Sequence, residues 1–199
     1  MKVVVFCEGS TEEALRTGLR EFVQARVRGA GRIGIETRSL DGPVMRKKLG
    51  RLVELSLAKS DVVGVVALSD VYPDFHDAKE AREALKRFGA VAGRDPRFRP
   101  HAAQFDLEAW IMPFWSEIAK HLGVNATTPG ARPEEIDNQR PPSHHLRDLY
   151  AKAKQRYEKV LDGAKWLTAE RLETAAGHCP ELKSFLNSLL EFAGADRLS

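Results

Sequence analysis

The run of residues 62–68, Val-Val-Gly-Val-Val-Ala-Leu, is the most hydrophobic stretch of the chain. Its β-branched residues follow one another without polar alternation, which predicts a strand that is buried on both faces. Strands of this kind lie in the interior of parallel sheets that helices cover on both sides. This run therefore favours an α/β fold with a mostly parallel sheet.

Strand and helix patterns alternate along the chain as far as residue 122. Besides the central run, apolar stretches predict strands over residues 3–7, 33–38 and 99–105. Apolar residues at helical spacing predict helices over residues 11–28, 44–59, 77–88 and 109–122. The alternation predicts roughly four strands in a mostly parallel sheet that is flanked by helices.

The pattern changes beyond residue 122. Residues 125–142 are rich in Pro, Thr, Asn and Gly and predict a long loop. Only helical patterns follow, over residues 143–161, 169–176 and 180–193. We expect residues 1–122 to form an α/β core and residues 123–199 to form a loop and helical extension packed on the same domain.

Composition excludes a membrane-spanning or disulfide-stapled protein. No apolar stretch is long enough to cross a bilayer, and residues 3–7 already have the pattern of a strand, so we expect no signal segment there. Cys7 and Cys179 form neither a disulfide framework nor a zinc motif, so we expect a cytoplasmic protein. The net charge of +3 is too mild to indicate nucleic-acid binding by itself.

Acidic residues follow three of the predicted strands: Glu8 the first, Asp70 and Asp74 the third, and Asp106 and Glu108 the fourth. The ends of parallel strands meet at one edge of the sheet, where neighbouring carboxylates raise one another's pKa unless a cation neutralises them. Carboxylate oxygens favour Mg²⁺ or Mn²⁺. Such a site could activate water and stabilise charge on a phosphodiester.

Helix capping is the alternative role for some of these acids. Asp77 and Asp106 stand where a carboxylate would cap the next helix. Ser10 and Glu13 have the S-x-x-E spacing of a capping box, which predicts a helix start there without any function. Glu8 lies outside that box and has no evident structural role.

Residues 8–12, Glu-Gly-Ser-Thr-Glu, resemble the E-G-x-T-E opening of Toprim domains, the fold of topoisomerases and primases that is shared by the overcoming-lysogenization-defect nucleases. Asp70 occupies the place of the Asp-x-Asp pair of that fold, with Tyr72 where the second aspartate stands. The chain is also similar to a family of small bacterial Toprim-domain proteins, through further short motifs in the same order at residues 70–72, 105–110, 133–137 and 141–143.

The resemblance implies an Mg²⁺-dependent site. The residue that matches Glu8 is a metal ligand or a general acid/base, and Asp70 holds metal. Glu12 and Glu108 match further acids of the nuclease branch, which would be ligands directly or through water. Because Tyr72 replaces the second aspartate, either Asp74 reaches the metal from a differently shaped loop or a second metal site is impaired.

Basic residues are candidates for phosphate contacts, although simple solvent exposure remains open for each. The candidates are Arg46, Lys47, Arg140, His144 and Arg147. Trp110 and Trp115 share an apolar helix pattern, so we expect them in the core and not as stacking platforms for bases.

The resulting hypothesis is a metal-dependent phosphoryl-transfer enzyme on nucleic acid, a Toprim-type endonuclease. The resemblance suits phage defence or DNA repair beside a separate ATPase. Two alternatives stay open: a non-catalytic nucleic-acid- or protein-binding effector module with a degenerate site, and a nucleotide phosphohydrolase.

Overall fold

The computed structural model describes residues 1–28, 31–90, 94–130, 132–136 and 140–199, without the side chains of Thr11 and Glu12. Asp137, part of one matched motif, lies outside the described residues.

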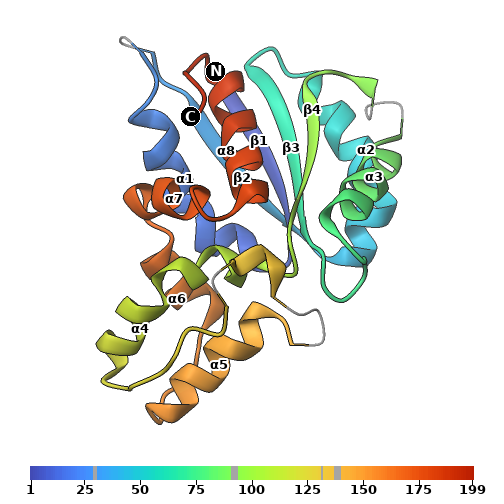
Figure 1. Ribbon diagram of the computed structural model, residues 1–199. Helices are drawn as coiled ribbons and strands as arrows, with labels where there is room; N and C mark the ends of the chain where they lie inside the picture. The colour runs from blue at the N-terminus through green and yellow to red at the C-terminus, as the bar shows by residue number, and fades with distance from the viewer. Residues whose placement is uncertain (29–30, 91–93, 131, 137–139) are drawn as a thin grey trace.

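Four parallel strands form the sheet in the order β2-β1-β3-β4 (Figure 1). They are β1 (Lys2–Glu8), β2 (Gly34–Leu40), β3 (Val62–Asp70) and β4 (Phe98–Ala103). The predicted α/β fold with a four-stranded parallel sheet flanked by helices is confirmed. β3, the most hydrophobic run, lies between β1 and β4, as its uninterrupted apolar pattern indicates.

Helices cover both faces of the sheet because successive side chains of a strand point to opposite faces. Val3 and Val5 pack in the larger core cluster, on the face of α1 (Thr11–Gln24) and of the C-terminal α7 (Ala169–Ala176) and α8 (Pro180–Phe192). Val4 and Phe6 pack on the other face. That face is covered by α2 (Gly42–Leu57) and α3 (Ala78–Phe88) (Figure 1).

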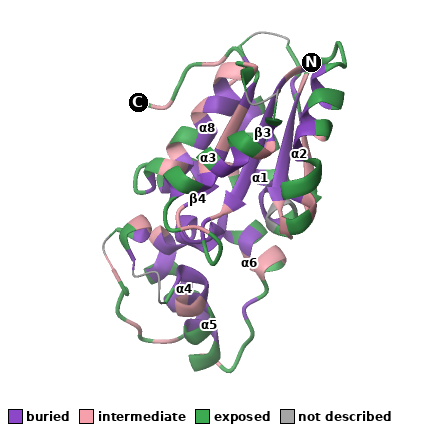
Figure 2. Cartoon of the chain, turned by 90° about the vertical axis from the view of Figure 1, so that its right-hand side faces the viewer, coloured by how far each residue is buried: buried purple, intermediate pink, exposed green. Residues whose placement is uncertain are grey.

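A second group of helices lies beyond the carboxyl ends of the strands, at the bottom of Figure 1. It contains α4 (Trp115–Leu122), α5 (Pro142–Lys152) and α6 (Lys159–Trp166). Leu146 of α5 and Trp166 of α6 belong to the same buried cluster as the inner face of α1. Figure 2 shows buried residues in the sheet and in these helices alike. Among the described residues, no helix combines the length and apolarity needed to cross a membrane.

Two predicted helices are wrong in extent. Residues 109–122 form no single helix: two short 3₁₀ helices, Leu107–Trp110 and Met112–Phe114, precede α4. Pro113 explains the break, because a proline inside a helix lacks the N–H and clashes with the preceding turn. Residues 143–161 are split into α5 and α6, and Lys154 lies after α5 with a φ of 57°, where an α-helix cannot continue.

The capping predictions have mixed outcomes. Asp77 accepts a hydrogen bond from the Glu80 N–H at 2.8 Å, which confirms its cap. The capping box is wrong, because Ser10 occupies the N-cap of α1 without a side-chain cap bond; the Glu13 N–H bonds the Ser10 carbonyl at 3.1 Å instead. Trp110 and Trp115 are buried, as predicted.

Gly18 joins α1 to the segment after α6, and this contact supports our first prediction. A Cβ at position 18 would lie 2.0 Å from the Leu167 carbonyl oxygen, so Gly18→Ala must push the two backbones apart. We expect the free energy of unfolding in urea to fall by about 1–3 kcal/mol. Thr17→Ala, at the exposed neighbouring position, is the control and should cost nothing; equal stability of the two variants would contradict this contact.

Candidate functional site

Glu8 and Asp70 end the two neighbouring central strands. In the sheet, β2 lies on one side of β1 and β3 lies on the other side. The direction in which successive strands are added therefore reverses between β1 and β3. In open α/β sheets, ligands bind in the crevice outside the carboxyl ends at such a switch point. The fold therefore brings two predicted site residues to the position where this architecture builds sites.

Glu8 is half-buried and packs against the start of α2. A Cβ at Gly42 would lie 2.6 Å from Glu8 Oε1, so a larger residue at position 42 would make this carboxylate shift. Burial raises the pKa of Glu8 to about 7, and the charges of Asp70 and Asp74 add to this effect. Arg46 and Lys159 offset it in part.

Asp70 is held by two groups from distant parts of the chain. Its Oδ1 accepts a hydrogen bond from the Leu107 N–H at 3.0 Å, and its Oδ2 lies 3.1 Å from Lys159 Nζ. The same ammonium lies 3.6 Å from Oε2 of Glu108, whose side chain is 2 % exposed. Lys159, the first residue of α6, therefore links the end of β3, through Asp70, to the segment after β4, through Glu108.

The environment of Lys159 is strongly negative. Burial by itself lowers the pKa of the ammonium, but the charges of Asp70 and Glu108 outweigh burial and raise it. Burial raises the pKa of Glu108 even though Lys159 counteracts it. The buried Tyr157 phenol has a raised pKa, through burial first and the Glu108 charge second. One lysine thus balances more than one carboxyl group.

Asp106 is, with Glu108, one of the two buried acids of this edge in the described part of the chain. Its Oδ2 accepts a hydrogen bond from the Ser143 N–H, in the first turn of α5, at 3.1 Å. Its Oδ1 is buried without a hydrogen-bond partner among the described residues. Burial, then the charges of Glu108 and Asp70, raise its pKa to about 7. The prediction that Asp106 caps the helix that follows it is wrong, because it makes no such bond and binds α5 instead.

Asp74 forms an ion pair with Arg46 of α2. Both residues, together with Glu8 and Ser69, line a cavity of about 10 Å³. That volume is about enough for one water molecule or ion.

The remaining predicted residues lie around this edge or away from it. Glu12 lies in the first turn of α1, and its side chain is outside what the structure describes. His144 contacts Tyr72 edge to face, with ring centroids 6.4 Å apart.

The other three predicted basic residues have no such contact at this edge among the described residues. Arg140 pairs with Asp148. Lys47 and Arg147 are exposed, and none of the described contacts joins them to the carboxylates.

Lys159 is the residue that the sequence analysis missed. It stands 89 positions from Asp70, in a stretch without a motif, so no local signal marked it. The arrangement of Asp106 at the start of α5 was missed for the same reason.

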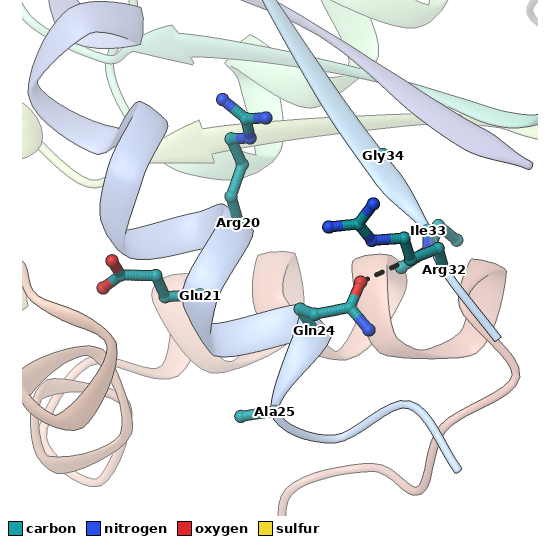
Figure 3. A pocket seen from close by; sticks show the side chains of 7 residues that line it. All are labelled: Arg20, Glu21, Gln24, Ala25, Arg32, Ile33 and Gly34. Carbon is teal, nitrogen blue, oxygen red and sulfur yellow. Dashed lines mark hydrogen bonds between the residues drawn. The ribbon is translucent and has the colours of Figure 1, made fainter. Parts of the chain in front are cut away.

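A separate hollow of about 650 Å³ lies between the end of α1 and the start of β2 (Figure 3). Arg20 and Arg32 extend over it, and Gln24 holds its rim by accepting a bond from the Ile33 N–H at 3.4 Å. Because β2 starts there, this hollow lies at the opposite end of the sheet from Glu8 and Asp70.

A divalent metal fits one part of this edge better than the other. Among the side chains that the structure describes, no three Asp, Glu, His or Cys groups are close enough to hold a metal ion. Lys159 already supplies the cation for Asp70 and Glu108, and Arg46 for Asp74. Glu8 makes no ion pair in the described contacts, and its oxygens are of the type that Mg²⁺ or Mn²⁺ prefers, whereas both oxygens of Asp70 already have a partner.

The fold and this edge define a doubly wound α/β protein with a carboxylate-rich switch point. The chain belongs to the family described as "Domain of unknown function (DUF4276)", whose model matches residues 7–190. No curated protein and no solved structure matches the chain.

Asp106→Asn should stabilise the protein at alkaline pH in metal-free buffer. The folded pKa of about 7 exceeds the unfolded value, so the contribution of Asp106 to the stability of the wild type falls as the pH rises from about 4 to about 7. Asparagine keeps an acceptor for the Ser143 N–H and carries no charge. We expect a gain of about 2–4 kcal/mol in urea unfolding at pH 8 that shrinks toward pH 4; a gain independent of pH would contradict the assigned cause.

Lys159→Met should destabilise the protein by about 3 kcal/mol at pH 8, because it leaves Asp70 and Glu108 without their cation. The loss should be smaller at pH 5, where buried carboxyl groups of raised pKa take up protons. Lys152→Met, at an exposed position of α5, is the control. Urea unfolding measures both variants, and equal losses in the two would show that the bridge contributes nothing.

Proposed function

We propose that this protein is a metal-dependent nuclease of the Toprim type. The observation that carries the proposal is the convergence of Glu8 and Asp70, with buried acids beside them, at the switch point of a parallel sheet. Carboxylates that raise one another's pKa favour a bound cation. The E-G-x-T-E resemblance at residues 8–12 supports the same assignment from the sequence side.

In this proposal Glu8 and Asp70 hold Mg²⁺ or Mn²⁺, with Glu12 as a further ligand. The ion, when bound, neutralises charge on a phosphodiester and lowers the pKa of a water molecule. Glu8 accepts or donates the proton, because it makes no ion pair in the described contacts. Lys159 places a second positive charge beside Asp70, where it can face a phosphate oxygen.

Two predicted ligands take a supporting role in the proposal. Glu108 is buried against Lys159, and Asp74 is paired with Arg46. We assign Glu108 to orienting the lysine and Asp74 to orienting the arginine, since each already has its cation within an ion-pair distance. Either acid could reach a metal only through water or after its ion pair opens.

Nucleic acid remains the proposed substrate. The proposed phosphate contacts remain Arg46, Lys47, Arg140, His144 and Arg147. Arg46 pairs with Asp74, and His144 contacts Tyr72. The Toprim resemblance extends the proposal to phage defence or DNA repair in the cytoplasm, beside a separate ATPase.

Two observations favour a rival from another class. Lys159 stands between Asp70 and Glu108, where an internal ammonium could replace a metal altogether. Tyr72 stands where a second acidic ligand is expected. A non-catalytic module that retains the fold would have both features.

Calorimetric titration with Mn²⁺ separates these functions. Wild type should bind the ion, and Asp70→Asn should bind it at least about tenfold more weakly, because it removes one ligand charge. Glu8→Gln should lower cleavage of single-stranded, duplex or transfer RNA substrates by about 10²–10⁴-fold, the usual contribution of a general acid or base.

Glu54→Gln, at an exposed position of α2, is the control for removal of one acid. Absence of Mn²⁺ binding in the wild type would contradict the metal site and favour the module. Cleavage of mononucleotides without cleavage of polymers would favour the phosphohydrolase. Unchanged cleavage by Glu8→Gln would remove that residue from the mechanism.

A further inference from the structure

We call the edge of the sheet that carries Glu8, Asp70, Asp106 and Glu108 the carboxylate edge. Tyr72 is an exposed aromatic residue that follows Asp70 at this edge. Its side chain is 41 % exposed, and it is the one aromatic among the large apolar side chains found exposed in the described part of the chain. Trp110 and Trp115, the other candidates for stacking, are buried. An aromatic face open to solvent at this place is available to a ligand.

The backbone under Tyr72 is fixed on the sheet. The Tyr72 N–H donates to the Phe105 carbonyl at 2.6 Å, and the Val71 N–H donates to the Ala103 carbonyl at 3.1 Å. Val71 is fully buried. The residue therefore continues the packing of β3 against the segment that follows β4.

The ring itself is braced by His144 from the first turn of α5. The two rings meet at an interplanar angle of 79°, an edge-to-face pair. Such a contact limits the orientations of the ring while leaving much of it exposed. A ligand that stacks on a restrained ring loses less conformational entropy than one that must order it.

The position relative to Asp70 decides what this ring can bind. Tyr72 follows Asp70 by two residues, so their Cα atoms are at most about 7 Å apart. The Lys159 ammonium pairs with Asp70, and Arg46 of α2 pairs with Asp74, which follows Tyr72 by two residues. Along the chain, Tyr72 thus stands between two acids that are each paired with a positive group, and this setting suits a molecule with a phosphate and a planar ring.

We propose that Tyr72, braced by His144, is a stacking subsite for an unpaired nucleobase. It receives the base of a nucleotide whose phosphate lies at the Asp70–Lys159 edge; this rests on the proposed function and specifies its substrate class. Stacking on one aromatic ring tolerates every base, because each base has a π-face. Bases within a duplex are covered by their neighbours, so the subsite takes single-stranded or extrahelical nucleotides.

The test measures binding apart from cleavage. Anisotropy of a fluorescein-labelled single-stranded oligonucleotide in EDTA gives the dissociation constant without metal-dependent chemistry. We expect Tyr72→Ala to bind about 5- to 100-fold more weakly than the wild type. Tyr72→Phe keeps the ring and should bind as the wild type does. Leu55→Ala, which removes another exposed apolar side chain, should change nothing.

A double-mutant cycle assigns the loss to the base. An oligonucleotide of abasic sites should bind the wild type as weakly as the normal strand binds Tyr72→Ala, and the variant should lose nothing further on the abasic strand. Duplex of the same sequence should be insensitive to Tyr72→Ala. Thermal unfolding of each variant accompanies these measurements, so that a folding defect is detected.

Each outcome assigns the failure to one proposal. Equal binding by wild type and Tyr72→Ala, an equal loss in Tyr72→Phe, or an equal effect on duplex would overturn the stacking subsite and leave the nuclease proposal standing. If the double-mutant cycle assigns the loss to the base but the protein cleaves no substrate, the result would support the subsite and count against the nuclease. Failure of the wild type to bind any oligonucleotide in EDTA would overturn the subsite, and the cleavage assay with metal then decides the nuclease proposal separately.

Discussion

The ammonium of Lys159, between the carboxylates of Asp70 and Glu108, is the interaction on which the arrangement of this molecule depends. It ties the start of α6 to the end of β3 and to the turn after β4. Withdrawing several carboxylates from water is costly, and a cation at ion-pair distance offsets part of that cost. The helices below the sheet are therefore fixed to the strand ends by charge as well as by their apolar contacts.

The same edge keeps more negative charge than its cations balance. Burial and mutual repulsion raise the pKa of Glu8 and of Asp106 to about 7, while Asp106 and Glu108 each retain a buried oxygen without a hydrogen-bond partner among the described residues. An excess of this kind is a cost to stability that a purely structural edge would avoid. It is also the condition under which a divalent cation or a proton is taken up readily.

Membership of the family assigns no reaction, so the chemistry has to be argued from the side chains. The carboxylates and the exposed tyrosine follow the ends of β1, β3 and β4, which meet at one edge of the sheet, and the lysine reaches them from α6. This meeting is a consequence of parallel topology, since strands that run the same way deliver their following residues to one edge. It gives a small chain several chemically different groups within a short distance.

The sequence alone determined the parallel sheet, the central place of β3, the acids at the strand ends and the burial of Trp110, because these follow from patterns over a few consecutive residues. Pro113 was a local signal for the broken helix, and the periodicity of its neighbours concealed it. Only the tertiary structure decided that Lys159 pairs with Asp70, that Asp106 binds the start of α5 and that Tyr72 is braced by His144. A charged or polar group takes whichever partner the folded chain brings near it, and no spacing along the sequence encodes a partner that lies 89 residues away.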